Sequence, residues 1–223
     1  MPSRTIAPIA VSLAGLFITT SVGILRAAES ARPEIGLFLR FDAPPGEVFL
    51  ATMEAELARI MRPADLQLRW LLPGDLNEKR AFARALVFTF HGACRARPGE
   101  ARGEQITGRV SLAETAGDGA SILPYSDVNC DRLRGFLSGE GPAGAGAESR
   151  LGFAMARVLA HEMYHVLLET RVHGRTGISR ARHTPSALLS RSLRFNDDEL
   201  TRMRARLRPA QTQTAQNISF RPN

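Results

Sequence analysis

The apolar residues of the chain change their spacing several times, and each change predicts a new element. Short stretches that are apolar or that alternate with polar residues are typical of strands. We expect strands over residues 36–41, 66–70, 86–91, 106–112 and 121–125. Pro124 indicates that the last of these lies at the edge of a sheet, because proline has no N–H to donate to a neighbouring strand.

Helical spacing appears in two longer segments, and a cap predicts a third helix. Residues 47–62 place apolar side chains at helical intervals and stop at Pro63. The segment from 149 to about 170 is apolar around much of its circumference, so that helix should be largely buried. Asn196, with Glu199 three residues later, is typical of a capping box, and Phe195 is placed to pack against Leu200.

This order of elements predicts one α+β domain over residues 31–208. It would have a mixed β-sheet with a backing helix, a buried helix and a small C-terminal helical part. A chain of 223 residues is long enough for one core and short for two. Its apolar fraction of 44% and charged fraction of 23% are ordinary for a soluble protein.

The first thirty residues have the pattern of an export signal. Arg4 precedes an uncharged, mostly apolar stretch over residues 6–25, and small residues follow it. We expect a cleaved signal peptide over residues 1–30 and a secreted or periplasmic, monomeric protein. The stretch is also just long enough to span a bilayer, so an uncleaved membrane anchor is the alternative. Residues 209–223 are polar and should form a disordered tail.

The net charge of +7 comes almost entirely from arginine, with Lys79 as the one lysine. These arginines are spread along the chain, whereas a nucleic-acid surface more often shows a clustered stripe or a recognisable motif. We therefore expect no nucleic acid as partner.

The two cysteines, Cys94 and Cys130, should form a disulfide in an exported chain, worth about 4 kcal/mol on a chain-entropy account. Two separate buried thiols are the alternative.

The predicted buried helix contains the sequence His161-Glu162-Met163-Tyr164-His165, an HExxH motif. Two histidines four residues apart lie on one helix face, so their imidazoles can converge on one metal ion. Zn²⁺ suits neutral imidazoles, and with three protein ligands it leaves one position for water. Glu162 would then act as the catalytic base that takes the proton of that water. Structural histidines on a partly exposed face are the alternative.

Through His161, Glu162 and His165 the chain resembles the zincin metallopeptidases, and the order of its elements is similar to theirs. The resemblance implies a zinc-dependent hydrolase that cleaves peptides or proteins. It also implies that an edge strand, here 106–112 or 121–125, pairs with the substrate backbone. The mature chain is similar as well to exported bacterial proteins with this layout.

The third ligand is the open part of the motif. The metzincin branch has a glycine three residues after its second histidine and a third histidine three residues later, but here Leu168 and Arg171 stand at those positions. Our candidate is His173, which gives the spacing HExxHx7H, with Gly174 and Gly177 ending the helix and turning the chain back. His183 is the alternative.

Two acidic residues are excluded as ligands. Glu169 lies two helical turns beyond His161, about 12 Å along the axis, which is too far to share its metal. Glu199 is explained by the capping box.

Two other functions stay open at this stage. One is a non-catalytic extracellular zinc-binding module, against which Glu162 argues, because binding alone does not need it. The other is a cationic surface-binding protein.

Overall fold

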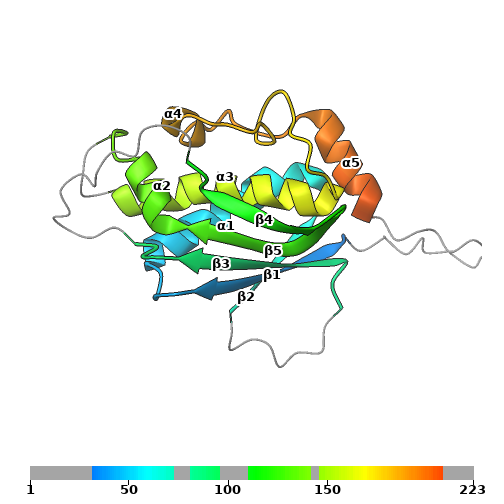
Figure 1. The fold of residues 1–223 in the computed structure, drawn as a ribbon, viewed down its shortest axis with the longest axis horizontal. Helices are drawn as coiled ribbons and strands as arrows, with labels where there is room; N and C mark the ends of the chain where they lie inside the picture. Colours follow the sequence, from blue (N-terminus) through cyan, green and yellow to red (C-terminus); the bar gives the residue numbers. More distant parts are fainter. Residues whose placement is uncertain (1–31, 73–80, 96–109, 142–145, 208–223) are drawn as a thin grey trace, which may run out of the picture. The chain divides into compact units, whose positions relative to one another are not determined.

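A five-stranded sheet organises the computed structural model, which describes residues 32–72, 81–95, 110–141 and 146–207 (Figure 1). The strands are β1 (Glu34–Phe41), β2 (Gln67–Leu71), β3 (Arg84–His91), β4 (Ala113–Asp118) and β5 (Ser121–Asn129). Their order in the sheet is β2-β1-β3-β5-β4. All neighbours are parallel except β4, which runs antiparallel to β5. The predicted mixed sheet is confirmed.

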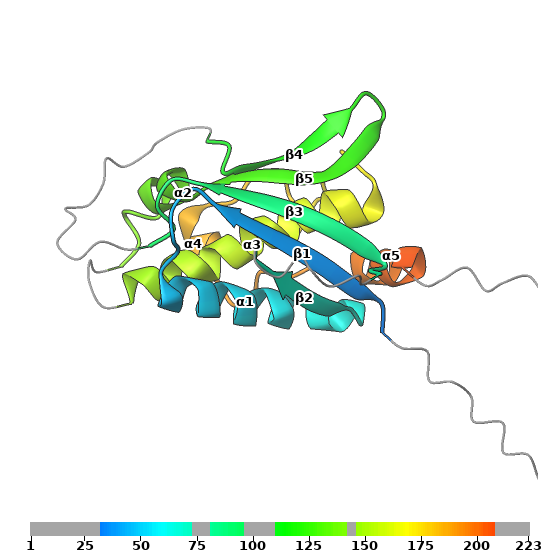
Figure 2. The ribbon, with the colours of Figure 1, turned by 90° about the horizontal axis from the view of Figure 1, so that it is seen from below.

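Two long helices cover one face of this sheet. These two are α1 (Glu47–Met61) and α3 (Ala147–Leu168). The shorter helices are η1 (Arg62–Ala64), a 3-10 helix that continues α1, and α2 (Cys130–Phe136), α4 (Pro185–Leu188) and α5 (Asp197–Leu207). Figure 2 shows α1 and α3 side by side along the sheet. Of the 22 residues of α3, 16 are buried, so it is the central helix, as its apolar circumference predicts. The α+β class is therefore confirmed.

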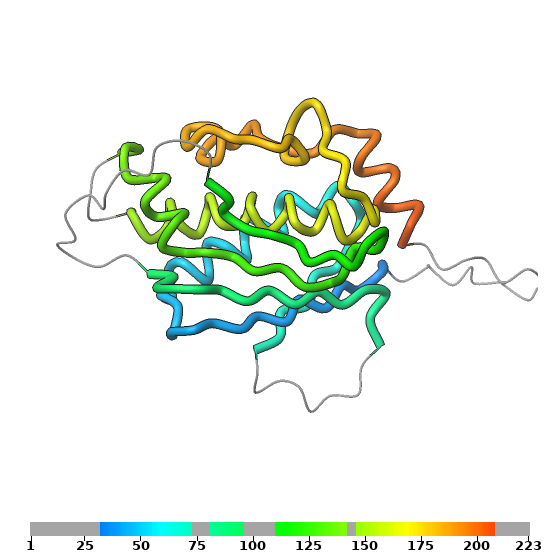
Figure 3. The backbone as a smooth tube through the Cα atoms, in the orientation of Figure 1, coloured from blue at the N-terminus to red at the C-terminus, as the bar shows by residue number. Residues whose placement is uncertain are grey.

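The C-terminal part returns over the central helix. After α3 the chain runs back along it through α4 and then reverses into α5, which packs beside the end of α3 (Figure 3). The predicted capping box is present, because the backbone N–H of Glu199 donates to Asn196 Oδ1 (2.9 Å) and that of Asn196 donates to Glu199 Oε2 (3.0 Å). Phe195 and Leu200 are both buried. Neither α2 nor α4 was predicted; both are too short to show a helical period.

Two strand predictions are wrong in detail. The strand predicted over 106–112 does not include residues 110–112, which are irregular, and residues 106–109 lie outside the described residues. The edge strand among the described residues is β4. The sequence of β4, AETAGD, has almost no apolar pattern, so it is a strand because β5 offers it a partner.

Pro124 does not mark an edge, since β5 lies between β3 and β4. It sits instead at a register shift. The pair Thr115 and Ser126 is followed by Gly117 and Ile122, so three residues of β5 face one of β4. Pairing of β5 with β3 starts only at Tyr125. Pro124 therefore lies in a bulge just before the residues of β5 that pair with β3, where its missing N–H interrupts none of these strand pairs.

The predicted export signal over residues 1–30 and the tail over 209–223 lie outside the described residues, so both stay predictions. None of the helices that the structure describes is long and apolar enough to cross a membrane.

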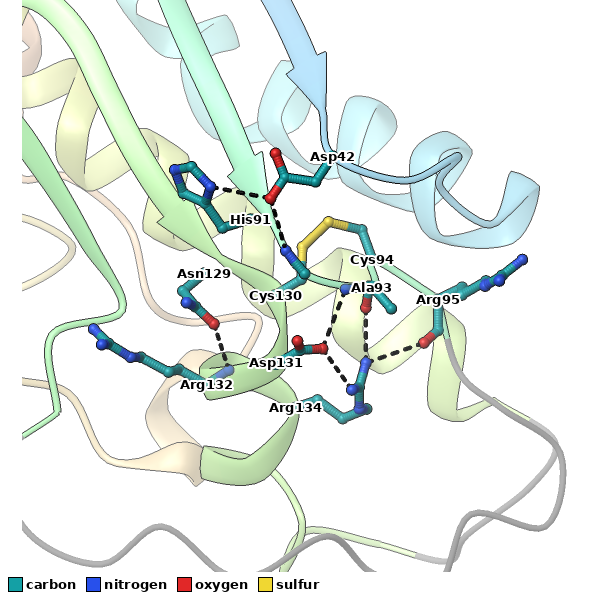
Figure 4. The surroundings of a disulfide bond; sticks show 11 residues. Asp42, His91, Ala93, Cys94, Arg95, Asn129, Cys130, Asp131, Arg132 and Arg134 are labelled. Atoms are coloured by element: carbon teal, nitrogen blue, oxygen red, sulfur yellow. Dashed lines mark hydrogen bonds and ion pairs between the residues drawn. A yellow bond between two sulfur atoms is a disulfide. The ribbon is translucent and has the colours of Figure 1, made fainter.

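The predicted disulfide between Cys94 and Cys130 is present, with Cα atoms 5.1 Å apart (Figure 4). It joins the segment after β3 to the start of α2. Asp131 supports the same junction, because its Oδ1 accepts hydrogen bonds from the backbone N–H of Ala93 (3.1 Å) and from Arg134 (2.6 Å). These contacts anchor α2 against the end of the sheet.

His91 connects three parallel strands at their carboxyl ends. Its Nε2 lies 3.2 Å from Asp127 on β5, and its Nδ1 lies 3.1 Å from Asp42, directly after β1 (Figure 4 shows the latter). Hydrogen bonds to Asp127 and Asp42 raise the pKa of His91 above its usual value. The folded state therefore favours the charged imidazolium.

This arrangement predicts a pH-dependent contribution of His91 to stability. A raised folded-state pKa stabilises the fold fully below the unfolded pKa of about 6.5, and that contribution is lost as the pH rises through the folded pKa. His91→Gln should therefore cost more stability at pH 5 than at pH 8.5. Because the imidazole is partly exposed, we expect a difference of about 1 kcal/mol or less. Urea unfolding of wild type and variant at both pH values measures it. The same cost at both values would contradict the assignment.

Candidate metal centre

Two histidines of α3 face the same point. His161 and His165 lie one helical turn apart, and their Nε2 atoms are 3.1 Å from one another. Two nitrogen ligands at about 2.05 Å from a tetrahedral Zn²⁺ would lie about 3.3 Å apart. The pair therefore has a spacing that suits one ion between the two rings.

The hydrogen bonds of the two rings decide which nitrogen is available. Nδ1 of His161 lies 2.8 Å from the carbonyl oxygen of Ile178, and Nδ1 of His165 lies 2.7 Å from that of Thr170. A carbonyl only accepts, so each Nδ1 donates its proton and each Nε2 of the neutral ring keeps a free lone pair. This is how histidine ligands are oriented in metal sites.

Burial keeps these two rings neutral. It lowers the pKa of His161 to about 4, with the neighbouring histidines adding to the effect. Burial likewise lowers the pKa of His165, and His173 contributes. A neutral imidazole is the form that binds a metal ion.

His173 completes the cluster. Its ring centroid is 4.8 Å from that of His165 and 5.2 Å from that of His161. One ligand atom from each of the three residues lies within 4.8 Å of the others. The neighbouring Val172 is held by Tyr164, whose hydroxyl donates to its carbonyl oxygen (2.9 Å). Tyr164 therefore fixes the segment that presents His173.

The helix ends earlier than predicted and without a glycine. Glu169 follows Leu168 in the left-handed conformation, at φ 49°, and reverses the chain. Its carboxylate accepts hydrogen bonds from Arg84 on β3 (2.8 Å) and Arg206 on α5 (2.7 Å), which lower its pKa. Two arginines thus hold a non-glycine residue in the left-handed turn that ends α3.

Gly174 and Gly177 act after the helix. At Gly174 any side chain would meet the Ser179 hydroxyl and the Glu199 carboxylate, which are hydrogen-bonded to one another. Gly177 has φ 68° and packs against the carbonyl of Arg194. The next residue is Ile178, whose N–H donates to that carbonyl (3.2 Å). The glycine turn therefore positions the carbonyl that orients His161.

Glu162 is buried beside this cluster. Thr115 of β4 donates its hydroxyl to Glu162 Oε2 (2.5 Å), and Thr115 shares a second hydrogen bond with Ser126 of β5 (2.9 Å). Burial raises the pKa of Glu162. A carboxylate with a raised pKa is better matched to proton transfer near neutral pH. Sequence reasoning missed Thr115 and Ser126, because no local pattern connects β4 to α3.

A cavity of about 560 Å³ opens beside the cluster and includes His161, Glu162 and His173 in its lining. It extends between α3 and two other segments, residues 110–113 and residues 180–183. We call it the arginine cavity, because Arg157, Arg180 and Arg182 line it. Its volume is within the range of about 300–1,000 Å³ that is usual for ligand sites.

The other residues considered from the sequence have different roles. His183 is not part of the three-histidine cluster; its Nε2 lies 3.0 Å from the carbonyl of Ile178, the acceptor it shares with His161. Glu199 is occupied by the capping box and by Ser179. Tyr125 is 53% exposed and does not line the arginine cavity.

Comparisons with known proteins give little beyond this geometry. The chain matches no protein-family model and no curated protein. Among solved structures it is similar to archaemetzincin from Methanopyrus kandleri, with a TM-score of 0.46 and 11% sequence identity, over 82% of this chain and 99% of that one.

The left-handed turn at Glu169 gives a test of the helix end. Glu169→Gly and Glu169→Ala both lose the contacts with Arg84 and Arg206, but only alanine keeps a side chain at positive φ. The alanine variant should therefore be less stable than the glycine variant by about 1 kcal/mol. Urea unfolding of the disulfide-bonded protein measures the difference. Equal stabilities would mean that the turn is not left-handed.

Proposed function

We propose that this protein is an exported zinc metallopeptidase in which His161, His165 and His173 hold the metal and Glu162 is the catalytic base. One observation carries the proposal: three imidazoles converge beside a buried carboxylate, and in two of them Nδ1 is tied to a carbonyl so that Nε2 faces the others. Such a donor set suits Zn²⁺ better than a hard ion such as Mg²⁺.

The site also has the parts that water activation requires. A zinc ion bound by three imidazoles supplies a Lewis acid that polarises a carbonyl and lowers the pKa of a water molecule. Glu162 lies in the cavity wall, where it would accept the proton of that water and pass it to the leaving amine. Thr115 holds one carboxylate oxygen and so fixes the orientation of this base.

An open strand edge lies next to the site and favours a peptide as the substrate. β4 is the last strand of the sheet, so one side of its backbone has no neighbour among the described strands. It also carries Thr115, the partner of Glu162, and begins at Ala113 in the cavity wall. An extended peptide could add to this edge by backbone hydrogen bonds and pass the catalytic base.

The ligand assignment predicts a contrast between two histidines. Changing an outer residue that only orients a ligand costs about 10- to 100-fold in metal affinity, so losing a ligand should cost more than that. We expect His173→Ala to weaken zinc binding by more than about 100-fold, and the matched His183→Ala to weaken it much less. Competition with a chelator measures both affinities, and wild type should bind one zinc per chain. If His183→Ala loses zinc and His173→Ala keeps it, the third ligand is His183.

The catalytic role predicts that Glu162→Gln keeps zinc and loses turnover. The amide retains the volume of the side chain but cannot take a proton, and general base catalysis contributes about 100- to 10,000-fold. We expect a loss of at least 100-fold in cleavage of a broad peptide library. Glu47→Gln, which neutralises an exposed carboxylate at the start of α1 and away from the cavity lining, is the matched control and should cleave at nearly the wild-type rate.

Zinc content and melting temperature must be unchanged in both variants for this comparison. If wild-type protein binds zinc but cleaves nothing in the library, the protein is a non-catalytic zinc-binding module. If Glu162→Gln cleaves as fast as wild type, another group supplies the base.

A further inference from the structure

The arginine cavity carries more positive charge than metal binding or water activation needs. Arg157, Arg180 and Arg182 line it, whereas Glu162 is the one carboxylate in its lining as described. Among the described residues, no carboxylate forms an ion pair with Arg180 or Arg182. Arg180 and Arg182 are both exposed and line the cavity, so their positive charge is open to a ligand there.

Arg157 is the buried one of the three arginines that line the cavity. It lies on α3 one turn before His161, and its side chain is fully buried. Both terminal nitrogens of its guanidinium have partners. Nη1 donates to the carbonyl of Phe153 (2.9 Å). Nη2 donates to the carbonyl of Ser190 and forms an ion pair with Glu56 Oε1 (2.8 Å each). Burial lowers its pKa to about 10, so it stays charged at neutral pH.

Two buried nitrogen atoms in the cavity lining have no hydrogen-bond partner among the described residues. They are Nε of Arg157 and Nδ1 of His183. Arginine Nε always carries a proton, so it is a donor without an acceptor. In His183, Nε2 faces the carbonyl of Ile178, so Nδ1 of the neutral ring is an acceptor without a donor. Both atoms are closed to solvent, so the cationic side chains that a ligand in the cavity can reach directly are those of the exposed Arg180 and Arg182.

We propose that the arginine cavity binds a carboxylate of the substrate next to the scissile bond. This inference rests on the proposed peptidase function and names the substrate class: peptides with an acidic group within one or two residues of the cleaved bond. The cavity shares His161 and Glu162 with the metal centre, so a group held there is close to the reacting carbonyl. Arginine suits the task, because its planar guanidinium binds carboxylates with paired hydrogen bonds.

The carboxylate could come from an aspartate or glutamate side chain or from the free C-terminus of a peptide. A lysine or arginine side chain would be repelled at the same place. Both sources present the same carboxylate group to the arginines, so the peptides of the test must distinguish a side chain from a C-terminus.

The experiment uses zinc-loaded wild-type protein and quenched fluorescent peptides that differ at one position beside the cleaved bond. That position holds Glu, Gln or Lys, and each peptide is made with a free and with an amidated C-terminus. We expect kcat/KM for Glu to exceed that for Gln by about tenfold and that for Lys by more. A fall in kcat/KM of about tenfold on amidation, the same for the Glu, Gln and Lys peptides, instead identifies the terminal carboxylate as the source.

Variants at the cavity mouth connect the preference to these residues. Arg180→Gln combined with Arg182→Gln should reduce the preference for the acidic peptide about tenfold and leave the Gln peptide nearly unchanged. Arg182→Glu should favour the Lys peptide. Arg194→Gln is the matched control, because Arg194 is an exposed arginine of the same segment that does not line the cavity. We avoid Arg157, whose replacement would leave Glu56 buried without this partner.

A binding measurement separates this inference from the proposed function. Fluorescence anisotropy of labelled Glu, Gln and Lys peptides on zinc-loaded Glu162→Gln protein needs no turnover. If peptides are cleaved without regard to charge, the inference is wrong and the peptidase function stands. If nothing is cleaved but the acidic peptide still binds about tenfold tighter and loses this in the arginine variants, the cavity assignment holds and the peptidase is wrong. Binding that ignores charge overturns the inference in either case.

Discussion

The imidazoles of His161 and His165 lie on a helix that is buried on most of its surface, and each needs an acceptor for the proton on Nδ1. A buried polar nitrogen without a partner would cost about 1–3 kcal/mol. Both acceptors are backbone carbonyls of the segment that follows α3, at Thr170 and Ile178. The path of that segment is therefore constrained by the helix it covers, and the same constraint turns Nε2 of both rings toward His173.

Several contacts from distant elements hold this path. The turn at Glu169 is fixed by arginines of β3 and α5, and Tyr164 of α3 itself holds Val172. Gly174 packs against Ser179, and Ser179 in turn donates to Glu199, which caps α5. The small C-terminal part is thus more than an appendage. It supplies Glu199, which accepts from Ser179, and Arg206, which pairs with Glu169. Both contacts keep the segment that covers α3 in place.

Charges elsewhere follow the rule that a buried charge needs a partner. Arg157 is paired with Glu56 of α1, and Glu162 accepts from Thr115 of the edge strand. Through these two pairs the central helix is tied to the helix beside it and to the strand where a substrate would pair. Among the described residues, three buried side-chain nitrogens lack a hydrogen-bond partner: Nε of Arg84, Nε of Arg157 and Nδ1 of His183. The last two belong to residues that line the arginine cavity.

Sequence by itself determined the features whose cause is local. The period of apolar residues predicted α1, α3 and most strands, the capping box predicted α5, and the spacing of His161 and His165 put both on one face, because each pattern acts within a turn or two. Which of His173 and His183 approaches the pair was decided by tertiary structure. His173 joins the pair, whereas His183 shares with His161 the carbonyl of Ile178, which only the glycine turn places. The end of α3 at Glu169, the strand at 113–118 and the contact of Thr115 with Glu162 were likewise decided by partners far along the chain. No local period encodes such contacts, because their energy appears only once the sheet and the helices have packed.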